Sequence, residues 1–335
     1  MNEFADLDKS TVLVTGASGF IGRHLVDYLL QRGCTVHCLV RETSDLRGLD
    51  LSRVHLHKAD LVGSPPPDSC VEQTDYVFHC AGLTRAKTRE AFFRINGEAC
   101  RPFYQGLAER GNSLKSIVHI SSLAAVGPAR PGGEVDENTP CNPLTFYGQS
   151  KRAGEEIARQ FFPALPIVIL RPPVVYGPGE KNFFTFLKAM DRGWNVQMGN
   201  SAREVSLIYI KDLVRAMVRA ATRPPEKENI FFITDGQAHA WTDVVHTVAD
   251  ILKTRPKTIV IPEGGLTLIA LGLEFVSMFT AKAPLLDRQR MIDIRQSSWT
   301  ASPKKFFAQY NFQPHYDLRK GMEETLDWYK KHQWI

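Results

Sequence analysis

Short apolar runs alternate with helical patterns through the first half of this 335-residue sequence. The helical patterns are longest at 20–32, 89–111 and 145–162. Parallel strands need crossover connections, so the alternation predicts an α/β fold built on a doubly wound parallel sheet. The expected strands cover residues 11–15, 35–40, 54–59, 75–81, 116–122 and 166–172.

The pattern becomes less regular after Arg171, where a turn-rich stretch precedes a helical segment at 181–192. Apolar runs at 204–210 and 229–234 either return to the large sheet or form a smaller one. We therefore expect two interleaved parts, a large domain and a smaller C-terminal lobe. The large domain covers 8–176 with returns near 204–236, and the lobe covers 177–203 and 237–335.

The composition is that of an ordinary soluble protein, with 43% hydrophobic and 23% charged residues. The net charge of +5 includes no block of basic residues, which argues against nucleic acid as a partner. Six cysteines without a CxxC pair indicate free thiols in a reducing compartment. The acidic N-terminus lacks the apolar stretch of a secretory signal, so we expect a cytoplasmic protein.

The segment "TGASGFIG" at 15–22 follows the first predicted strand and begins the first predicted helix. Its glycines allow a tight turn and a close approach of the backbone to phosphate, and the helix N-terminus offers free N–H groups. This context predicts a dinucleotide site in a Rossmann-type sheet. The expected cofactor contacts here are Gly16, Ser18, Gly19, Phe20, Ile21 and Gly22.

The end of the second strand bears on the choice of dinucleotide. A carboxylate there would bind the adenosine ribose of NAD, but this chain has Arg41, with Ser44 close behind. Arginine binds a 2′-phosphate through charge-assisted hydrogen bonds, so NADP(H) is favoured. The adjacent Glu42 keeps NAD(H) as the alternative. Asp60 and Leu61, after the third strand, are expected near the adenine.

"YGQSK" places Tyr147 and Lys151 on one face of a predicted helix. An ammonium group beside a phenol favours the phenolate, so we expect Lys151 to lower the pKa of Tyr147. "HISS" ends the fifth strand and brings Ser121 and Ser122 to the carboxyl edge of the sheet, where ligands bind in such folds. Ser122, Tyr147 and Lys151 are therefore the expected catalytic residues.

The stretches "TGASGFIG", "HCAGLT", "RINGEA", "HISSLAAVG", "YGQSK" and "RPPVVYGPG" resemble the extended short-chain dehydrogenases/reductases, the epimerase/dehydratase superfamily. The resemblance is nearest the branch of 3β-hydroxysteroid dehydrogenases and dihydroflavonol reductases. It implies that Ser122 orients a carbonyl, Tyr147 transfers the proton, and Lys151 binds the nicotinamide ribose.

The same resemblance implies further contacts and an assembly. Ala81 and Gly82 would line the cofactor, and Asn96 would be a structural support. Pro172, Val174 and Val175 would lie along the nicotinamide carboxamide. The family also favours a homodimer through the helices at 89–111 and 145–162.

Two features bear on the substrate. Sugar-nucleotide members carry an arginine where this chain has Val205, although Arg203 lies two residues away. The apolar segment 266–279 is too short to span a membrane, and it is either a core helix, a lid over a hydrophobic substrate or a peripheral membrane contact. His55 and His57 have no third ligand, so no metal is expected.

We therefore expect an NADP(H)-dependent oxidoreductase that interconverts a ketone and a secondary alcohol. Its substrate would be a small lipophilic molecule that resembles a sterol, flavonoid or lipid. One alternative is a sugar-nucleotide epimerase or dehydratase that retains NAD. The other is a non-catalytic regulatory protein that binds NAD(P).

Overall fold

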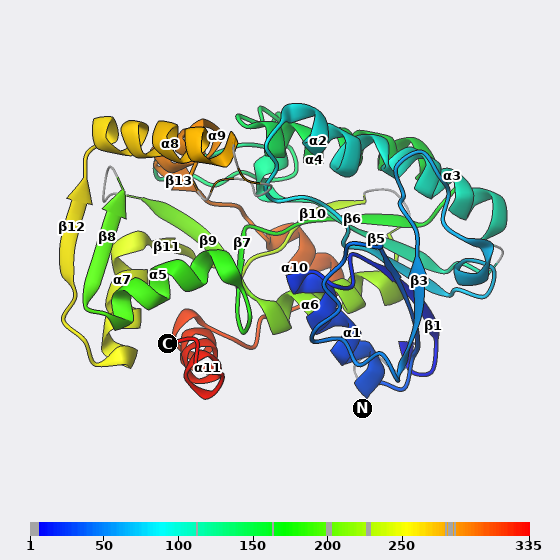
Figure 1. Ribbon diagram of the computed structural model, residues 1–335. Helices are drawn as coiled ribbons and strands as arrows, with labels where there is room; N and C mark the ends of the chain where they lie inside the picture. Colours follow the sequence, from blue (N-terminus) through cyan, green and yellow to red (C-terminus); the bar gives the residue numbers. More distant parts are fainter. Residues whose placement is uncertain are drawn as a thin grey trace.

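The computed structural model describes residues 7–111, 113–162, 164–198, 203–225, 229–278, 280, 284 and 286–335. Its largest element is a seven-stranded parallel sheet with the order β10-β6-β5-β4-β1-β2-β3 (Figure 1). The first six strands have the Rossmann order, which confirms the predicted doubly wound fold. The strands are β1 (Thr11–Thr15), β2 (Thr35–Val40), β3 (Val54–Lys58), β4 (Tyr76–His79), β5 (Ser116–Ile120), β6 (Ile167–Arg171) and β10 (Ile230–Phe232).

Helices cover both faces of this sheet (Figure 1). One face carries α2 (Arg89–Phe93), α3 (Cys100–Arg110) and α4 (Phe146–Phe161), and the other carries α1 (Phe20–Gln31) and α6 (Ile210–Thr222). Because helices shield both faces, the central strands β4, β5 and β6 are buried along their whole length.

The predicted helix over 89–111 is interrupted. A π-helical turn at Arg94–Glu98 separates α2 from α3, and π-helical turns often occur at functional sites. Two 3₁₀ turns complete this half of the molecule, at Asp68–Cys70 and at Leu123–Ala125.

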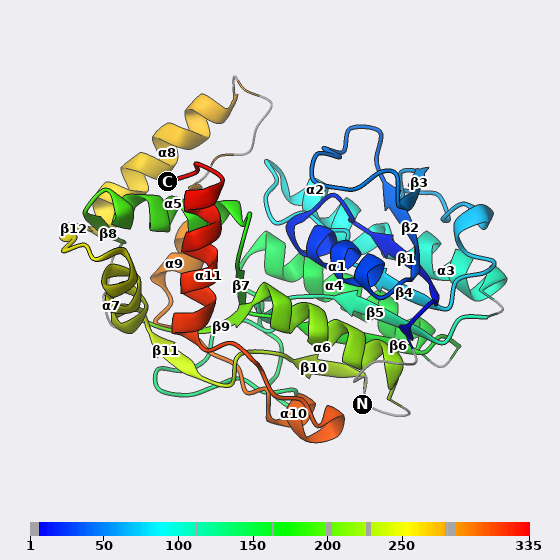
Figure 2. The ribbon, with the colours of Figure 1, turned by 90° about the horizontal axis from the view of Figure 1, so that it is seen from below.

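The apolar runs at 204–210 and 229–234 belong to different sheets. β10, from the second run, joins the large sheet, whereas β9, from the first, lies in a second, four-stranded sheet. Figure 2 shows the small lobe beside the large sheet. Its strands are β7 (Val174–Tyr176), β9 (Glu204–Tyr209), β11 (Ala238–Ala240) and β13 (Ser298–Trp299), with a separate ribbon of β8 (Trp194–Met198) and β12 (Lys257–Ile261). Its helices are α5 (Lys181–Asp191), α7 (Trp241–Leu252), α8 (Glu263–Met278), α9 (Arg288–Arg295) and α11 (Leu318–Lys331), while α10 (Lys304–Tyr310) packs near β10.

Helix α8 contains nearly all of the apolar segment 266–279, whose last residue lies outside the described residues. In the part of the chain that the structure describes, no helix is long and apolar enough to cross a membrane. All six cysteines are free, as their spacing predicts.

The parallel strands bring their carboxyl ends to one edge of the sheet. The predicted site residues follow these ends: Gly16 after β1, Arg41 after β2, Asp60 after β3, Ala81 after β4 and Ser122 after β5. The loop after β6 begins with Pro172. The topology therefore gathers residues from six separate stretches of sequence along one edge.

Candidate active site

The glycines of the first loop are required by its geometry. Gly16 has a φ of +68°, and a Cβ there would lie 2.7 Å from the backbone nitrogen of Ala81. A Cβ on Gly22 would lie 2.2 Å from the carbonyl oxygen of Gly16. Gly19 caps α1 without a side chain, and the first turn of α1 has no acidic residue, so this helix end suits an anion. These residues fit the pyrophosphate of a dinucleotide.

Arg41 begins a tight turn directly after β2. Its backbone N–H donates to Ser44 Oγ (3.0 Å), and the Ser44 N–H donates back to the carbonyl oxygen of Arg41 (3.0 Å). The side chain of Arg41 is exposed at the sheet edge. Glu42, the rival ribose ligand, accepts a hydrogen bond from Lys58 Nζ (3.0 Å). Nearby, Asp60 is exposed and caps its own turn by accepting from the Val62 N–H (3.1 Å).

Tyr147 and Ser122 meet at the end of β5. Tyr147 lies in the first turn of α4, which begins at the N-cap Thr145, whose Oγ1 accepts from the Gly148 N–H (3.3 Å). Ser122 starts the 3₁₀ turn that follows β5, and its Oγ accepts from the Ala124 N–H (3.2 Å). The side chains of Ser122 and Tyr147 are hydrogen-bonded to each other.

Lys151 is buried one turn further along α4, and its Nζ donates to the carbonyl oxygen of Ile120 (2.5 Å). The same ammonium lies 3.5 Å from where a Cβ on Gly82 would stand. Burial lowers the pKa of Lys151, while the nearby Cys100 and Glu155 act in the opposite direction. The fixed amine thus faces the loop after β4, where the predicted cofactor contacts Ala81 and Gly82 lie.

Asn96 holds that loop against the catalytic helix. Its Oδ1 accepts from the Leu83 N–H (2.7 Å), and its Nδ2 donates to the Leu83 carbonyl oxygen (2.9 Å) and to Ser150 Oγ (2.9 Å). Asn96 lies in the π-helical turn between α2 and α3. The interruption of the predicted helix therefore aims this side chain at both the loop and α4.

A buried ion pair separates the roles of the two serines. Arg171 donates to both carboxylate oxygens of Glu155, at 2.8 and 2.7 Å. Ser121 Oγ donates to the same carboxylate (2.6 Å). Ser121 is consequently occupied by the core, whereas the Ser122 hydroxyl faces Tyr147.

The remaining predicted contact lies along the loop after β6. The carbonyl oxygen of Pro172 accepts from the Leu123 N–H (2.9 Å), which ties this loop to the turn of Ser122. Val174 is 44% exposed and Val175 is half-buried, both at the start of β7. Pro172, Val174 and Val175 thus border the Ser122 turn.

The expected lowering of the Tyr147 pKa by Lys151 is wrong for this structure. Burial raises the pKa of Tyr147, the hydrogen bond from Ser122 opposes this, and Arg290 and Asp293 act on it as charges. The ammonium of Lys151 is bonded to Ile120 instead. Tyr147 is therefore a protonated phenol at neutral pH, ready to donate.

Three charged residues of the site escaped sequence reasoning, namely Arg85, Arg290 and Asp293. Helix α9 carries two of them and contacts the catalytic helix directly, since the Phe146 N–H donates to Gln289 Oε1 (2.8 Å). Burial raises the pKa of Asp293 to about 7, with Arg290 lowering it. Among the described residues, Asp293 Oδ1 has no hydrogen-bond partner.

Arg85, from the loop after β4, reaches the small lobe. Its Nη2 donates to Asn182 Oδ1 on α5, whereas its buried Nε has no partner in the described part of the chain. Burial lowers the pKa of Arg85, and Arg290 acts in the same direction. Arg85, from the sheet edge, and α9, from the small lobe, therefore form a polar side of the site.

A histidine cluster lies beneath Lys151, where His79, Cys100 and His119 bring their ligand atoms within 4.8 Å of one another. Burial lowers the pKa of His79 to about 3, and Lys151 adds to this lowering. The imidazoles are therefore neutral; His119 Nδ1 is hydrogen-bonded to the Tyr104 hydroxyl (2.6 Å), whereas its Nε2 has no partner in the described part of the chain. A cation there would lie close to the ammonium of Lys151, so we assign no metal to the cluster.

The model of the NAD dependent epimerase/dehydratase family matches residues 12–233. The chain belongs to this family. The match spans the whole sheet edge described above and includes the glycine loop, Ser122, Tyr147 and Lys151. The chain is accordingly an NAD(P)-dependent enzyme of the extended short-chain dehydrogenase/reductase type.

Several relatives within this superfamily act on lipids or sugars by name. The ceramide reductase of Caulobacter vibrioides is 26% identical over 335 residues, which cover 98% of this chain and 96% of the reductase. The decarboxylating sterol-4-alpha-carboxylate 3-dehydrogenase of Candida albicans is 25% identical over 349 residues, which cover 95% of this chain and 97% of the dehydrogenase. A solved structure of MoeE5 in complex with UDP-glucose and NAD matches with a TM-score of 0.76 and 25% identity. The match covers 96% of this chain and 99% of MoeE5.

Proposed function

We propose that this enzyme interconverts a ketone and a secondary alcohol on a lipophilic substrate, with NADP(H) as the favoured cofactor. The observation that carries the proposal is the hydrogen-bonded pair of Ser122 and Tyr147, set beside the buried Lys151. Two adjacent hydroxyls at one point of the sheet edge suit the oxygen of a carbonyl group.

In the direction of reduction, Ser122 and Tyr147 would donate hydrogen bonds to the substrate carbonyl oxygen. When bound, the nicotinamide supplies the hydride to the carbonyl carbon. Tyr147 would then give its proton to the oxygen, which its raised pKa allows because the phenol is protonated at neutral pH. Lys151 would bind the nicotinamide ribose from its position near Gly82, and the hydrogen bond from Ser122, which lowers the pKa of Tyr147, would stabilise the phenolate that forms.

Two observations support a lipophilic substrate. Val205 of β9 is partly buried against the core, in the position where the family resemblance of the sequence would place the arginine of sugar-nucleotide enzymes. The relatives that match along nearly their whole length include a ceramide reductase and a sterol dehydrogenase. A ketone on a long-chain or polycyclic lipid is therefore the substrate class we propose.

The preference for NADP(H) rests on the turn after β2. Arg41 is exposed there, and the carboxylate of Glu42 is already paired with Lys58. A 2′-phosphate would meet two cations at this edge, whereas a ribose hydroxyl would have to compete with Lys58 for Glu42. NAD(H) is the alternative cofactor, as in the MoeE5 complex.

The test is NADPH oxidation by the purified enzyme with a panel of lipophilic ketones, comprising 3-ketosteroids, flavanonols and long-chain 3-keto lipids. Tyr147→Phe should reduce turnover by at least about a hundredfold while leaving NADPH binding intact. Tyr310→Phe is the matched control, because its buried hydroxyl has no partner among the described residues. Unchanged turnover in Tyr147→Phe would refute the mechanism.

The likeness to MoeE5 favours a second candidate, a sugar-nucleotide epimerase or dehydratase that retains NAD through catalysis. The two candidates differ in what leaves the enzyme. A reductase releases oxidised cofactor in proportion to product, whereas the second candidate converts a UDP-sugar with no net change in nicotinamide absorbance. Conversion of UDP-glucose or UDP-glucuronic acid without cofactor release would decide for it.

We also propose a cytoplasmic homodimer that pairs through the helices at 89–111 and 145–162. These helices lie on one face of the large sheet, where α3 and α4 are adjacent (Figure 1). Light scattering after gel filtration measures the mass directly. A mass of one chain would refute the dimer.

A further inference from the structure

One region of the small lobe exposes most of the molecule's outward apolar side chains. Among the described residues, ten large hydrophobic side chains are exposed, and eight of them belong to β8, β12 and α8. Soluble proteins seldom gather exposed apolar residues in this way unless a partner covers them. We call this region the α8 surface, and it consists of Trp194, Val196, Ile259, Val260, Leu268, Ile269, Leu271 and Leu273.

Helix α8 is apolar on both its inner and its outer side. Its inner side packs Leu266 and Ala270, both buried, against Met291 of α9. Its outer side presents Leu268, which is 72% exposed, and Leu271, which is 44% exposed. A helix with apolar residues all round is normally enclosed, so the outer side indicates a second apolar environment.

The ribbon of β8 and β12 extends this surface and adds positive charge. β12 leads into α8 through Pro262, and its Ile259 pairs in register with Val196 of β8. Four exposed cations lie in or beside the ribbon in sequence, against two exposed acids, Asp191 and Asp250, of which Asp250 pairs with Arg319. The cations are Arg192, Lys253, Arg255 and Lys257.

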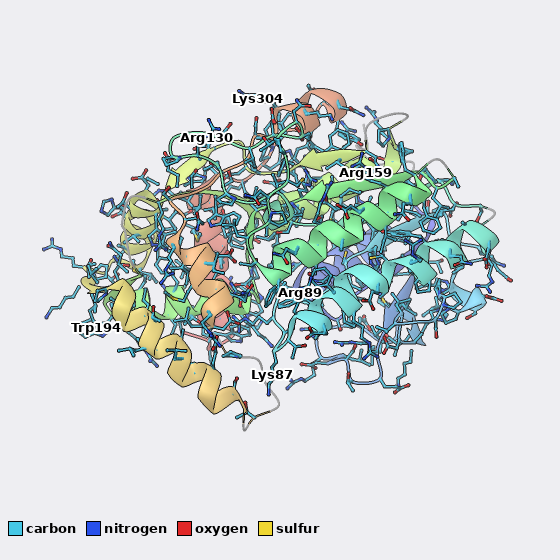
Figure 3. All side chains as sticks on the ribbon, turned by 90° about the horizontal axis from the view of Figure 1, so that it is seen from above. Lys87, Arg89, Arg130, Arg159, Trp194 and Lys304 are labelled. Carbon is cyan, nitrogen blue, oxygen red and sulfur yellow. The ribbon has the colours of Figure 1, made fainter. Side chains whose placement is uncertain are left out.

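The opposite end of α8 also carries a cation. Lys87 Nζ donates to the carbonyl oxygen of Ser277 (2.7 Å), and Figure 3 shows Lys87 at the C-terminal end of the helix. Figure 3 also shows Trp194 at the other end of the region, on β8. Tryptophan and flanking Lys or Arg residues are typical of segments that lie in a membrane interface.

We propose that the α8 surface docks on an anionic lipid bilayer, with α8 lying in the plane of the interface. The apolar side chains would enter the acyl boundary, and the flanking cations would contact anionic headgroups. A second copy of the chain would bury the same leucines, but it would bring two equal sets of cations together. The bilayer fits both the apolar area and its charge.

This docking would place the lipid close to the proposed site. α8 packs on α9, and α9 contacts the first turn of α4, where Tyr147 lies. A lipophilic substrate would thus leave the bilayer beside the polar side of the site. The docking itself stands without the proposed function, since it rests only on the exposed surface.

The test is co-sedimentation of the full-length protein with vesicles of phosphatidylcholine alone and of phosphatidylcholine mixed with phosphatidylglycerol. We expect binding to the mixed vesicles that weakens as salt is added. The double variant Leu268→Glu, Leu271→Glu should lower the bound fraction at least about tenfold. Leu51→Glu is the matched control, because Leu51 is 51% exposed and lies outside the α8 surface.

Retained NADPH binding would show that the double variant is folded. Three results would overturn the proposal. They are wild-type protein that binds neither kind of vesicle, an equal loss in Leu51→Glu, and a wild-type dimer that the double variant converts to a monomer.

Discussion

At the sheet edge, Lys151, Asn96 and Glu155 each have hydrogen-bond partners within the chain. Across from them, Arg85 and Asp293 keep buried polar atoms that have no partner among the described residues. The first arrangement is complete without a ligand, as expected for groups that must hold one cofactor in one geometry. The second arrangement leaves hydrogen-bonding capacity for a ligand, so we expect Arg85 and Asp293 to contribute to selectivity for the substrate.

The largest effect on stability is expected at the sheet edge, where the polar groups are already paired within the chain. Glu155→Leu would leave the guanidinium of Arg171 buried without its counter-charge and would lower the free energy of unfolding by about 3–5 kcal/mol. Glu156→Leu is the matched control, because the carboxylate of Glu156 is exposed and, among the described residues, pairs with Arg152 alone. Urea unfolding measures both variants. An equal loss in the two would contradict the assignment of Glu155 to the core of the sheet edge.

Asp293 tests the side of the site where buried polar atoms have no partner among the described residues. Its pKa is raised from 3.8 to about 7, so folding costs increasingly more free energy as the pH rises from about 4 to 7. Asp293→Asn removes this cost, and its melting temperature should exceed that of the wild type by an amount that grows over this range and is constant above it. Arg290 and Asp287, the charges that act on Asp293, remain in the variant.

The control for Asp293 is Asp250→Asn, an exposed carboxylate that pairs with Arg319. Its melting temperature should follow the wild type at every pH. A difference between Asp293→Asn and the wild type that does not change with pH would show that burial of the carboxylate has no such cost.

Arg41 tests whether the sheet edge also selects the cofactor. Arg41→Ala should raise the dissociation constant for NADPH about tenfold, the value of one charge-assisted hydrogen bond, and change that for NADH little. Nicotinamide fluorescence measures both. Arg47→Ala is the control, because Arg47 is exposed nearby but paired with Asp45. An equal loss of affinity for NADPH and NADH would show that Arg41 does not bind the 2′-phosphate.

The smallest effect is expected at Gly272, and Gly22 of the glycine loop provides the contrast. A Cβ on Gly272 of α8 meets nothing within 4 Å, so Gly272→Ala should raise the free energy of unfolding by roughly 0.5–1 kcal/mol. Gly22→Ala should instead destabilise the protein, because its Cβ would lie 2.2 Å from the Gly16 carbonyl oxygen. Thermal unfolding compares the two. Stabilisation by both substitutions would contradict the close approach in the glycine loop.

The sequence predicts the large sheet well, because buried parallel strands are apolar runs with sharp limits. β1 and β2 agree with their predicted ranges residue for residue, at Thr11–Thr15 and Thr35–Val40. The partner of a strand is harder to predict than the strand itself. β9 and β10 read alike in sequence, yet only β10 continues the large sheet.

The lobe side of the site could not be predicted, since it depends on contacts between distant segments. Gln289 bonds to Phe146 across 143 residues, and no local pattern in "RQRMIDIR" indicates that contact. The ribbon was also missed, although the β-branched run "KTIVI" at 257–261 carries a strand signal. The direction of the Tyr147 pKa shift was wrong because burial depends on the whole fold.

The ribbon strand β12, helix α8 and helix α9 follow one another along residues 257–295. One stretch of the chain therefore supplies six of the eight residues of the α8 surface together with Arg290 and Asp293, while the glycine loop and Arg41 lie more than 200 residues earlier. Evolution could replace this stretch as a module. We expect the exchange of such a segment between relatives to change substrate selectivity and to leave the cofactor chemistry as it was.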